Sequence, residues 1–230
     1  VTAGQGRLGQ FVFLMVMFIL MIVGIIYVEQ GQRRIPIQFA KRVRGRKVMG
    51  GQSTYIPLKV NSAGVIPVIF ATSILFFPAL VATSLPQDNN VTAAIRNWID
   101  INLANSQGTT WFYVFFLGIL IIFFTYFYTT IQFDPVRQSD MIRRQGGFVP
   151  GVRPGISTTN YLSHIINRIT LPGSVFLASV AVLPSIASVI WDIPLGFSGI
   201  SILITVGVAL ETMKQIESQL SMRNYEGFID

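Results

Sequence analysis

The side chains best suited to bind a partner are basic ones gathered in one short stretch. Residues 33–59 contain eight basic residues and no acidic one, namely Arg33, Arg34, Lys41, Arg42, Arg44, Arg46, Lys47 and Lys59. Apolar residues are interleaved among them, first Ile35, Ile37 and Phe39 and then Val43 and Val48. This interleaving indicates an ordered hairpin rather than a loose polybasic tail, and an ordered projection favours a specific, bulky anionic partner.

Three interpretations of this basic stretch are open from the residues alone. It can be a topology signal only, because cytoplasmic loops of membrane proteins are rich in lysine and arginine. It can be drawn to anionic lipids, at about 1 kcal/mol per basic residue near the surface. It can also dock to RNA phosphates, with an affinity that falls steeply as salt rises because counterions are released.

A second basic segment follows later in the chain. Residues 134–168 carry five arginines and two aspartates. Glycine and proline are so frequent within residues 146–155 that we predict a set of tight turns there. Arg153 lies between these turns, so it is either held in place for a partner or is an incidental surface arginine.

Motifs of known catalytic sites are absent from the sequence. Residues 45–51 are rich in glycine, but no Lys-Ser or Lys-Thr pair follows Gly50, so they do not form a phosphate-binding P-loop. The sequence has no GxSxG or HExxH motif, no cysteine, and one histidine, His164. We therefore expect no catalytic residue, no metal site and no cofactor.

The segments that flank the basic stretches are typical of membrane spans. The chain is 51% hydrophobic and 12% charged, whereas about 25% charged residues is usual in soluble domains. About 20 apolar residues cross the hydrocarbon core of a bilayer as a helix. We predict spans at residues 8–28, 62–84, 111–131, 169–189 and 197–216. Prolines at 67, 78, 172 and 184 predict kinked or broken helices.

Charge fixes the expected orientation of these spans. By the positive-inside rule, the connections 29–60 and 132–168 and the tail 217–230 are cytoplasmic, so the amino end lies outside. Residues 211–220 are predicted to extend the last helix beyond the membrane, and residues 93–103 to form a short amphipathic helix in the external connection. An odd number of spans with an outside start, and a first residue that is not methionine, suit a portion of a longer chain.

Two functional classes compete at this point. A secondary transporter for a small solute would need ionisable residues at membrane depth. The predicted spans have none deep in the membrane, since Glu211 and Lys214 belong to residues 211–220, which are predicted to extend the last helix beyond it. A membrane anchor without a pore would need only the basic loop, bound to lipid or RNA.

Three segments resemble the SecY family, the central subunit of the Sec translocon. Residues 52–67 (QSTYIPLKVNSAGVIP) are similar to the segment that leads into the seventh span of that family. Residues 147–155 (GFVPGVRPG) resemble its loop between spans eight and nine, and residues 206–220 (VGVALETMKQIESQL) its last span and tail. Because the matches are in order and correctly spaced, the chain resembles spans six to ten, the second half of the family fold.

The resemblance implies an all-α polytopic membrane protein whose five spans form one half of an inverted-repeat clamshell channel. It implies passage of unfolded secretory proteins across the bacterial plasma (inner) membrane, and sideways release of hydrophobic segments into lipid. The implied partners are the N-terminal half of SecY, SecE, SecG, the ATPase SecA, the ribosome with its RNA and proteins at the exit tunnel, the secretory polypeptide, and membrane lipids.

The resemblance also assigns roles to residues of this chain. Ile69 and Ile204 align with the aliphatic pore ring, which blocks ions because a narrow apolar constriction dewets. The polar residues of the lateral gate are Asn61, Ser62, Thr72 and Ser73. The residues expected to dock the ribosome or SecA are Arg33, Arg34, Lys41, Arg42, Arg46, Lys47 and Arg153.

Overall fold

The structure is a computed structural model that describes residues 2–39, 42–44, 47–49, 53–84, 90–103, 110–191 and 198–226. Its elements, in chain order, are α1 (Thr2–Gln30), β1 (Gln32–Phe39), β2 (Arg42–Arg44), β3 (Lys47–Met49), β4 (Ser53–Lys59), α2 (Ile66–Ser84), α3 (Asn90–Asn102), α4 (Trp111–Gln132), α5 (Pro135–Arg144), β5 (Gly147–Phe148), α6 (Ile156–Trp191) and α7 (Gly199–Glu226).

Five of the described helices are long and apolar enough to cross a membrane: α1, α2, α4, α6 and α7. The predicted short helix is present as α3, and the predicted extension of the last helix is present because α7 runs to Glu226. Helix α2 begins at Ile66 rather than at residue 62, since Gly64 at φ +64° makes a turn before it. Helix α6 begins at Ile156, well before residue 169, because Leu162 and Ile165 lie buried on its first turns.

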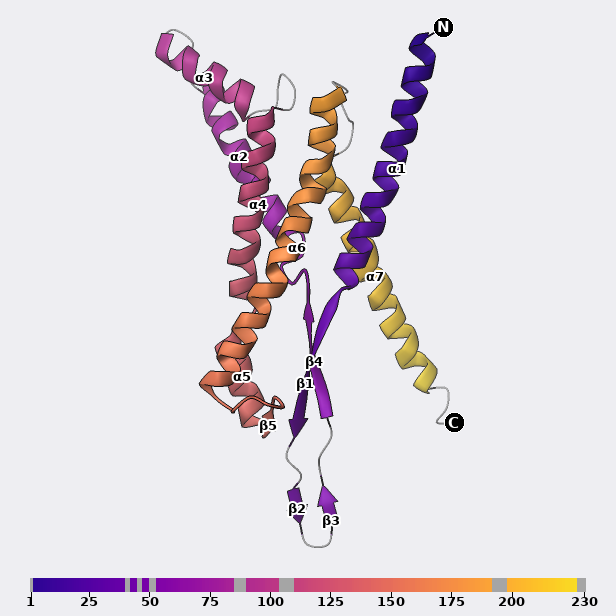
Figure 1. Ribbon diagram of the computed structural model, residues 1–230, viewed down its shortest axis with the longest axis vertical. Helices are drawn as coiled ribbons and strands as arrows, with labels where there is room; N and C mark the ends of the chain where they lie inside the picture. Colours follow the sequence, from indigo (N-terminus) through magenta and orange to yellow (C-terminus); the bar gives the residue numbers. More distant parts are fainter. Residues whose placement is uncertain are drawn as a thin grey trace.

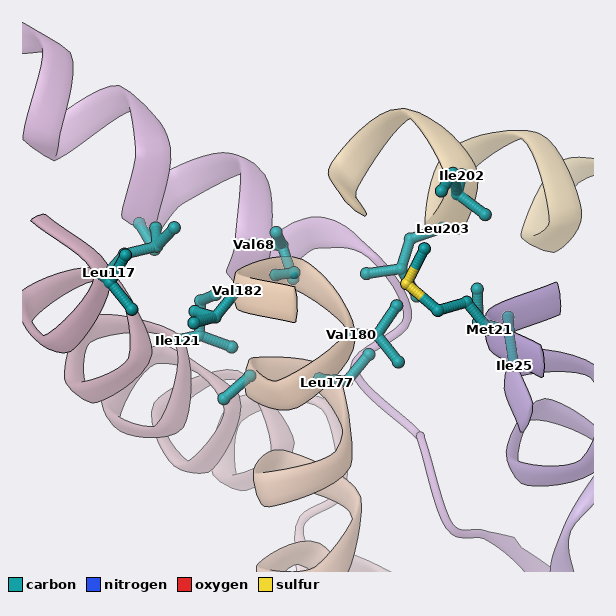
Figure 2. Close-up of a cluster of buried hydrophobic side chains, with 14 of the residues drawn as sticks. Met21, Ile25, Val68, Leu117, Ile121, Leu177, Val180, Val182, Ile202 and Leu203 are labelled. Carbon is teal, nitrogen blue, oxygen red and sulfur yellow. The ribbon is translucent and has the colours of Figure 1, made fainter. Parts of the chain in front are cut away.

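Helix α6 lies in the middle of the described helices. In Figure 1 it runs through the helical part of the molecule, with α4 and α2 on one side and α1 and α7 on the other. Figure 2 shows the same division at side-chain level. Leu177, Val180 and Val182 of α6 lie between Leu117 of α4 and Met21 of α1. A helix that is buried on both sides needs apolar residues all round, and residues 177–182 of α6 have only Ser179 as a polar exception.

The prolines of α6 and α2 do not break these helices, so of the two predicted outcomes, a kink or a break, the break does not occur. Helix α6 continues through Pro172 and Pro184, and α2 through Pro78. Proline has no N–H, so Pro184 leaves the carbonyl of Val180 without its helical donor. The backbone of Gly199, at the start of α7, packs directly against that carbonyl. A neighbouring helix thus occupies the site that the proline opens.

The basic stretch forms the predicted hairpin. Strands β1 and β4 pair antiparallel, with Ile35 opposite Ile56 and Arg33 opposite Leu58. Strands β2 and β3 pair beyond them, so the hairpin projects past the helices in Figure 1. Strand β5 adds to the other edge of β1, giving the sheet order β4-β1-β5. The fold is therefore helical, as predicted, with a small sheet in its connections.

A second apolar cluster joins the hairpin to the later basic segment. Ile35, Ile37 and Leu58 of the hairpin are buried together with Ile142 of α5, Val149, and Leu162 and Ile165 of α6. Gly147 of β5 is tightly enclosed, because a Cβ there would lie 3.0 Å from Ile37 and 3.2 Å from Ile142. The two connections therefore form one folded unit, which we call the basic end of the molecule.

A close backbone contact fixes this unit to α6. The base of the hairpin is closed by a hydrogen bond of 2.9 Å from the amide of Val60 to the carbonyl of Gly31. The carbonyl of Val60 in turn packs on Gly173 of α6, where a Cβ would lie only 2.7 Å from it. Only glycine at position 173 allows this approach.

We expect Gly173→Ala to destabilise the protein, because the added methyl group must push the base of the hairpin away from α6. Overpacking of this kind costs typically 1–3 kcal/mol. Gly118→Ala in α4 is the matched control, since its Cβ would meet only Val182, at 3.9 Å. The measurement is the thermal unfolding midpoint of the purified protein in detergent. Equal midpoints for the two variants would contradict the close contact.

Candidate functional site

One face of α2 carries a pore candidate and two gate candidates. Ile69, Thr72, Ser73 and Phe76 lie on it at helical spacing, and Ile69 is 45% exposed. The Thr72 hydroxyl donates to the carbonyls of Val68 and Ile69, both at 3.0 Å, and the Ser73 hydroxyl donates to Ile69 at 2.8 Å. Because both hydroxyls are satisfied within their own helix, this face needs no partner helix to complete its hydrogen bonds.

One face of α7 lies opposite this face of α2. Ile200, Ile204 and Gly207 follow at spacings of four and three residues, and Ile204 is 38% exposed. A Cβ at Gly207 would lie 3.6 Å from Val65, the residue before α2. Ile200 lines a cavity together with Thr72, Ser73 and Phe76. The two helices run in opposite directions in Figure 1.

These two contacts set the relative height of the isoleucines. Val65 lies at the level of Gly207, and Thr72 and Ser73 lie at the level of Ile200. On α2, Ile69 lies between Val65 and the pair Thr72 and Ser73. On α7, Ile204 lies between Gly207 and Ile200. The structure therefore brings the two predicted pore residues to the same level, from segments that are far apart in the sequence.

Two hollows lie along this face of α7, on either side of Ile204. The first, of about 370 Å³, is lined by Thr72, Ser73, Leu75, Phe76, Leu103, Tyr113 and Ile200. The second, of about 440 Å³, is lined by Glu29, Lys59, Gly207, Leu210, Glu211, Lys214, Gln215, Ser218, Gln219 and Met222. The second hollow faces the basic end and contains two acids and two bases, so its lining is polar without a strong net charge.

Asn61 occupies a different environment from the other gate candidates. It is 5% exposed, and its Nδ2 donates to Oε2 of Glu29 at 3.0 Å and to the carbonyl of Gly64 at 3.2 Å. This ties the end of α1 to the turn that starts α2. Among the described residues, its Oδ1 has no hydrogen-bond partner. The Ser62 hydroxyl donates to the carbonyl of Lys59 at 3.0 Å.

The docking candidates that the structure describes lie at the basic end. Arg33 and Arg34 are exposed on β1, and the guanidinium carbon of Arg34 lies 4.8 Å from the ring centre of Tyr55. This cation–π contact holds the arginine in a defined position. Arg42 and Lys47 belong to the strands β2 and β3 at the hairpin tip, and Lys41 and Arg46 lie outside the described residues.

Arg153 is exposed after a glycine turn, with Gly151 at φ +81°. The carbonyl of Arg153 accepts a hydrogen bond of 3.0 Å from the Thr158 hydroxyl, which fixes the backbone at that point. Strand β5 precedes this turn and pairs with β1, Gln38 lying opposite Phe148. The sheet therefore places Arg153 and the hairpin arginines in one folded unit.

Sequence reasoning did not select the arginines of α5. Arg137, Arg143 and Arg144 are exposed at the same end. Asp134 caps this helix by accepting hydrogen bonds from the amides of Val136 and Arg137, at 2.9 and 3.3 Å. Within the described part of the chain the only salt bridge joins Arg96 and Asp100, so the arginines of the basic end keep their charge available. The Asp-Pro pair before a run of polar residues was the signal that could have revealed this helix.

A family model described as SecY matches residues 2–213. The chain belongs to the SecY family. Two relatives described as "Protein translocase subunit SecY" are those of Streptomyces scabiei, 51% identical over 217 residues, and Thermus thermophilus, 46% identical over 230 residues. These matches cover 92% and 100% of this chain but 47% and 51% of the relatives, so the chain spans about half the length of the curated relatives it matches.

Solved structures show the same fold. One described as "The structure of a protein conducting channel" superposes with a TM-score of 0.55 at 18% identity, over 89% of this chain and 48% of that chain. Another, whose description concerns the plug domain of the SecY protein, superposes with a TM-score of 0.55 at 20% identity, over 89% of this chain and 49% of the other. This confirms the predicted fold, one half of a SecY-type channel.

We expect Asn61→Ala to destabilise this SecY-family chain by about 1.5–3 kcal/mol, because it removes a partly buried hydrogen bond to a carboxylate. Glu29→Gln should have a smaller effect, since an amide oxygen still accepts from Asn61. The control is Ser62→Ala, a neighbouring change outside this contact. Thermal midpoints of the purified variants give the comparison, and a midpoint for Asn61→Ala equal to that of Ser62→Ala would disprove the tie.

Proposed function

We propose that this chain is the second half of a channel subunit that passes unfolded secretory proteins across the bacterial plasma membrane. The observation that carries this proposal is the pair of hollows on either side of Ile69 and Ile204. An extended polypeptide would enter the polar hollow at the basic end, pass the isoleucines, and leave through the hollow beside Thr72 and Ser73. The relatives are described as translocase subunits, which supports the same function.

The isoleucines act as a seal in this proposal. Each is partly exposed in the described chain, so each has a side that other parts of the channel can meet. A narrow ring of aliphatic side chains excludes water and therefore ions. It makes no directional bonds, so it can yield to any passing sequence and close again behind it.

Helix α2 supplies the movable wall through which hydrophobic segments leave for the lipid. Its hydroxyls at Thr72 and Ser73 are bonded to its own backbone. If α2 separates from the opposite half of the channel, no buried polar group is left without a partner, so opening avoids that penalty. Ser62 lies just before this helix. Asn61, tied to Glu29, links the gate helix to the base of the hairpin.

The basic end is the docking face, on the cytoplasmic side, for the ribosome or for SecA. Its exposed arginines on β1, on α5 and at Arg153 form no salt bridge within the described residues, and together they make a cationic surface that suits phosphate or carboxylate groups. Arg42 and Lys47, on the hairpin strands β2 and β3, are proposed to take part in docking. The same role is proposed for Lys41 and Arg46, which lie outside the described residues. The driving energy would come from these partners, the chain itself performing no catalytic step. SecE, SecG and the first half of the channel complete the assembly in the membrane.

Photocrosslinkers at Ile69 and Ile204 should form adducts with a secretory chain that is stalled in the channel. A probe at Phe123 is the control, because this side chain is 61% exposed on the side of α4 opposite its buried residues Ile121 and Thr125. We expect adducts at the first two positions and none at the third. If stalled chains crosslink equally to all three positions, or only to Phe123, the pore assignment fails.

Reversal of Arg153 to glutamate should abolish SecA-driven export while the protein stays folded, because this exposed side chain stabilises no core contact. Arg168→Glu is the control, since it makes the same change in net charge on an exposed turn of α6. Export of a secretory protein into inverted membrane vesicles measures the effect, and Arg153→Lys should restore part of it. Normal export by Arg153→Glu, or equal loss in both reversals, rejects a specific role for this arginine.

A further inference from the structure

Helix α3 turns its apolar side outward and its charges inward. The large side chains Val91, Ile95, Trp98 and Ile101 are 69%, 47%, 52% and 47% exposed. They recur at intervals of three and four residues, so they form one continuous stripe along the helix. Its charged residues, Arg96 and Asp100, lie on the less exposed side and pair with each other at 3.8 Å.

This arrangement is the reverse of what water favours. A helix on the surface of a soluble protein buries its apolar stripe and exposes its charges. In α3 the side-chain exposures of Arg96 and Asp100 are only 28% and 31%, lower than those of the four apolar residues. The outward face of α3 therefore suits an apolar surrounding.

The stripe is continuous with an apolar surface of α4. The ring of Trp98 meets that of Phe112 edge-on, with centres 5.8 Å apart, and Phe112 stacks on Phe116 at 6.0 Å. Phe112 and Phe116 are 42% and 39% exposed, on a helix long and apolar enough to cross a membrane. The surrounding that covers this side of α4 therefore extends to α3.

The position of the tryptophans agrees with a membrane boundary. The chain has three: Trp98 on α3, Trp111 at the start of α4 and Trp191 at the end of α6. Figure 1 shows all three of these segments at the end of the molecule opposite the hairpin. Tryptophan concentrates where hydrocarbon meets water, because its ring is apolar and its N–H is polar.

We propose that α3 is an interfacial membrane helix, with its stripe immersed in the boundary between lipid headgroups and acyl chains and its Arg96–Asp100 pair turned away from the lipid. Such helices bury their apolar face about 5–10 Å into this boundary. Arg96 and Asp100 are the only charges in α3 and they cancel, so the binding is apolar and does not require anionic lipid.

The membrane position proposed for α3 has a mechanical consequence for α2. Helix α3 packs against α2 and follows it in the chain. An α3 that is held in the membrane surface restrains the end of α2 farthest from the hairpin. Movement of that end must then drag a helix through the lipid boundary. This inference does not depend on the proposed passage of polypeptides.

Site-directed spin labelling tests the proposal in the protein reconstituted into phosphatidylcholine vesicles. Because this chain contains no cysteine, single cysteines can be introduced at Val91, Ile95 and Trp98, with matched controls on the other side of α3 at Ala93 and Asp100. Collisions with oxygen, which is enriched in lipid, and with a neutral nickel chelate, which is enriched in water, are measured for each label. We expect the oxygen-to-nickel ratio to be several-fold higher at the stripe than at the controls.

Any of three other results would overturn the proposal. A low ratio at the stripe, caused by strong nickel collisions, would mean that the face lies in water. Protection of the stripe from both reagents would mean that a protein surface covers it instead. A repeat with phosphatidylglycerol vesicles at low and high salt should give the same ratios. A ratio that depends on anionic lipid would contradict apolar binding.

Discussion

The fold depends on close backbone packing against α6 at two small residues. At Gly173 the carbonyl of Val60 lies where a side chain would stand, and at Gly199 the start of α7 lies against the carbonyl that Pro184 leaves free. Apolar side chains gain little by leaving lipid for a helix interface, so close contact and small residues hold membrane helices together. These contacts place the hairpin and α7 on one central helix, and through it they set the position of α2 relative to α7.

The basic end is held by a different force. Its cluster around Ile37, Leu162 and Val149 lies in the connections, where burial removes apolar surface from water. Each such side chain contributes about 1.5–3 kcal/mol when fully buried. The arginines take no part in this core and remain exposed around it. The proposed docking face is therefore already folded around this cluster, and a pre-formed surface loses less entropy on binding.

The candidate channel surface separates polar groups from open faces. Along α2, the hydroxyls of Thr72 and Ser73 bond to the preceding turn, and the side chains before and after them on the same face, Ile69 and Phe76, are apolar. Along α7, the face changes from Ile200 and Ile204 to a polar series that begins beyond Gly207. In the proposed channel, one face of α7 would contribute both to the apolar constriction and to the polar entrance. On α3, the inverted exposure of charges and apolar groups places lipid where a soluble protein would meet water.

The sequence by itself determined the five apolar helices, the hairpin and the amphipathic nature of residues 93–103, because hydrophobic period and charge distribution are local properties. The resemblance in residues 52–67 and 147–155 was sufficient to indicate the family. The sequence did not determine that α6 continues through two prolines, since the compensating contact comes from Gly199, fifteen residues beyond Pro184. The resemblance assigned Asn61 to the gate. Only the structure shows that Asn61 bonds to Glu29, which is 32 positions away in the chain. That Ile69 and Ile204 stand at one level, between two hollows, is decided only by how α2 and α7 pack, because no local pattern encodes the height of one helix against another.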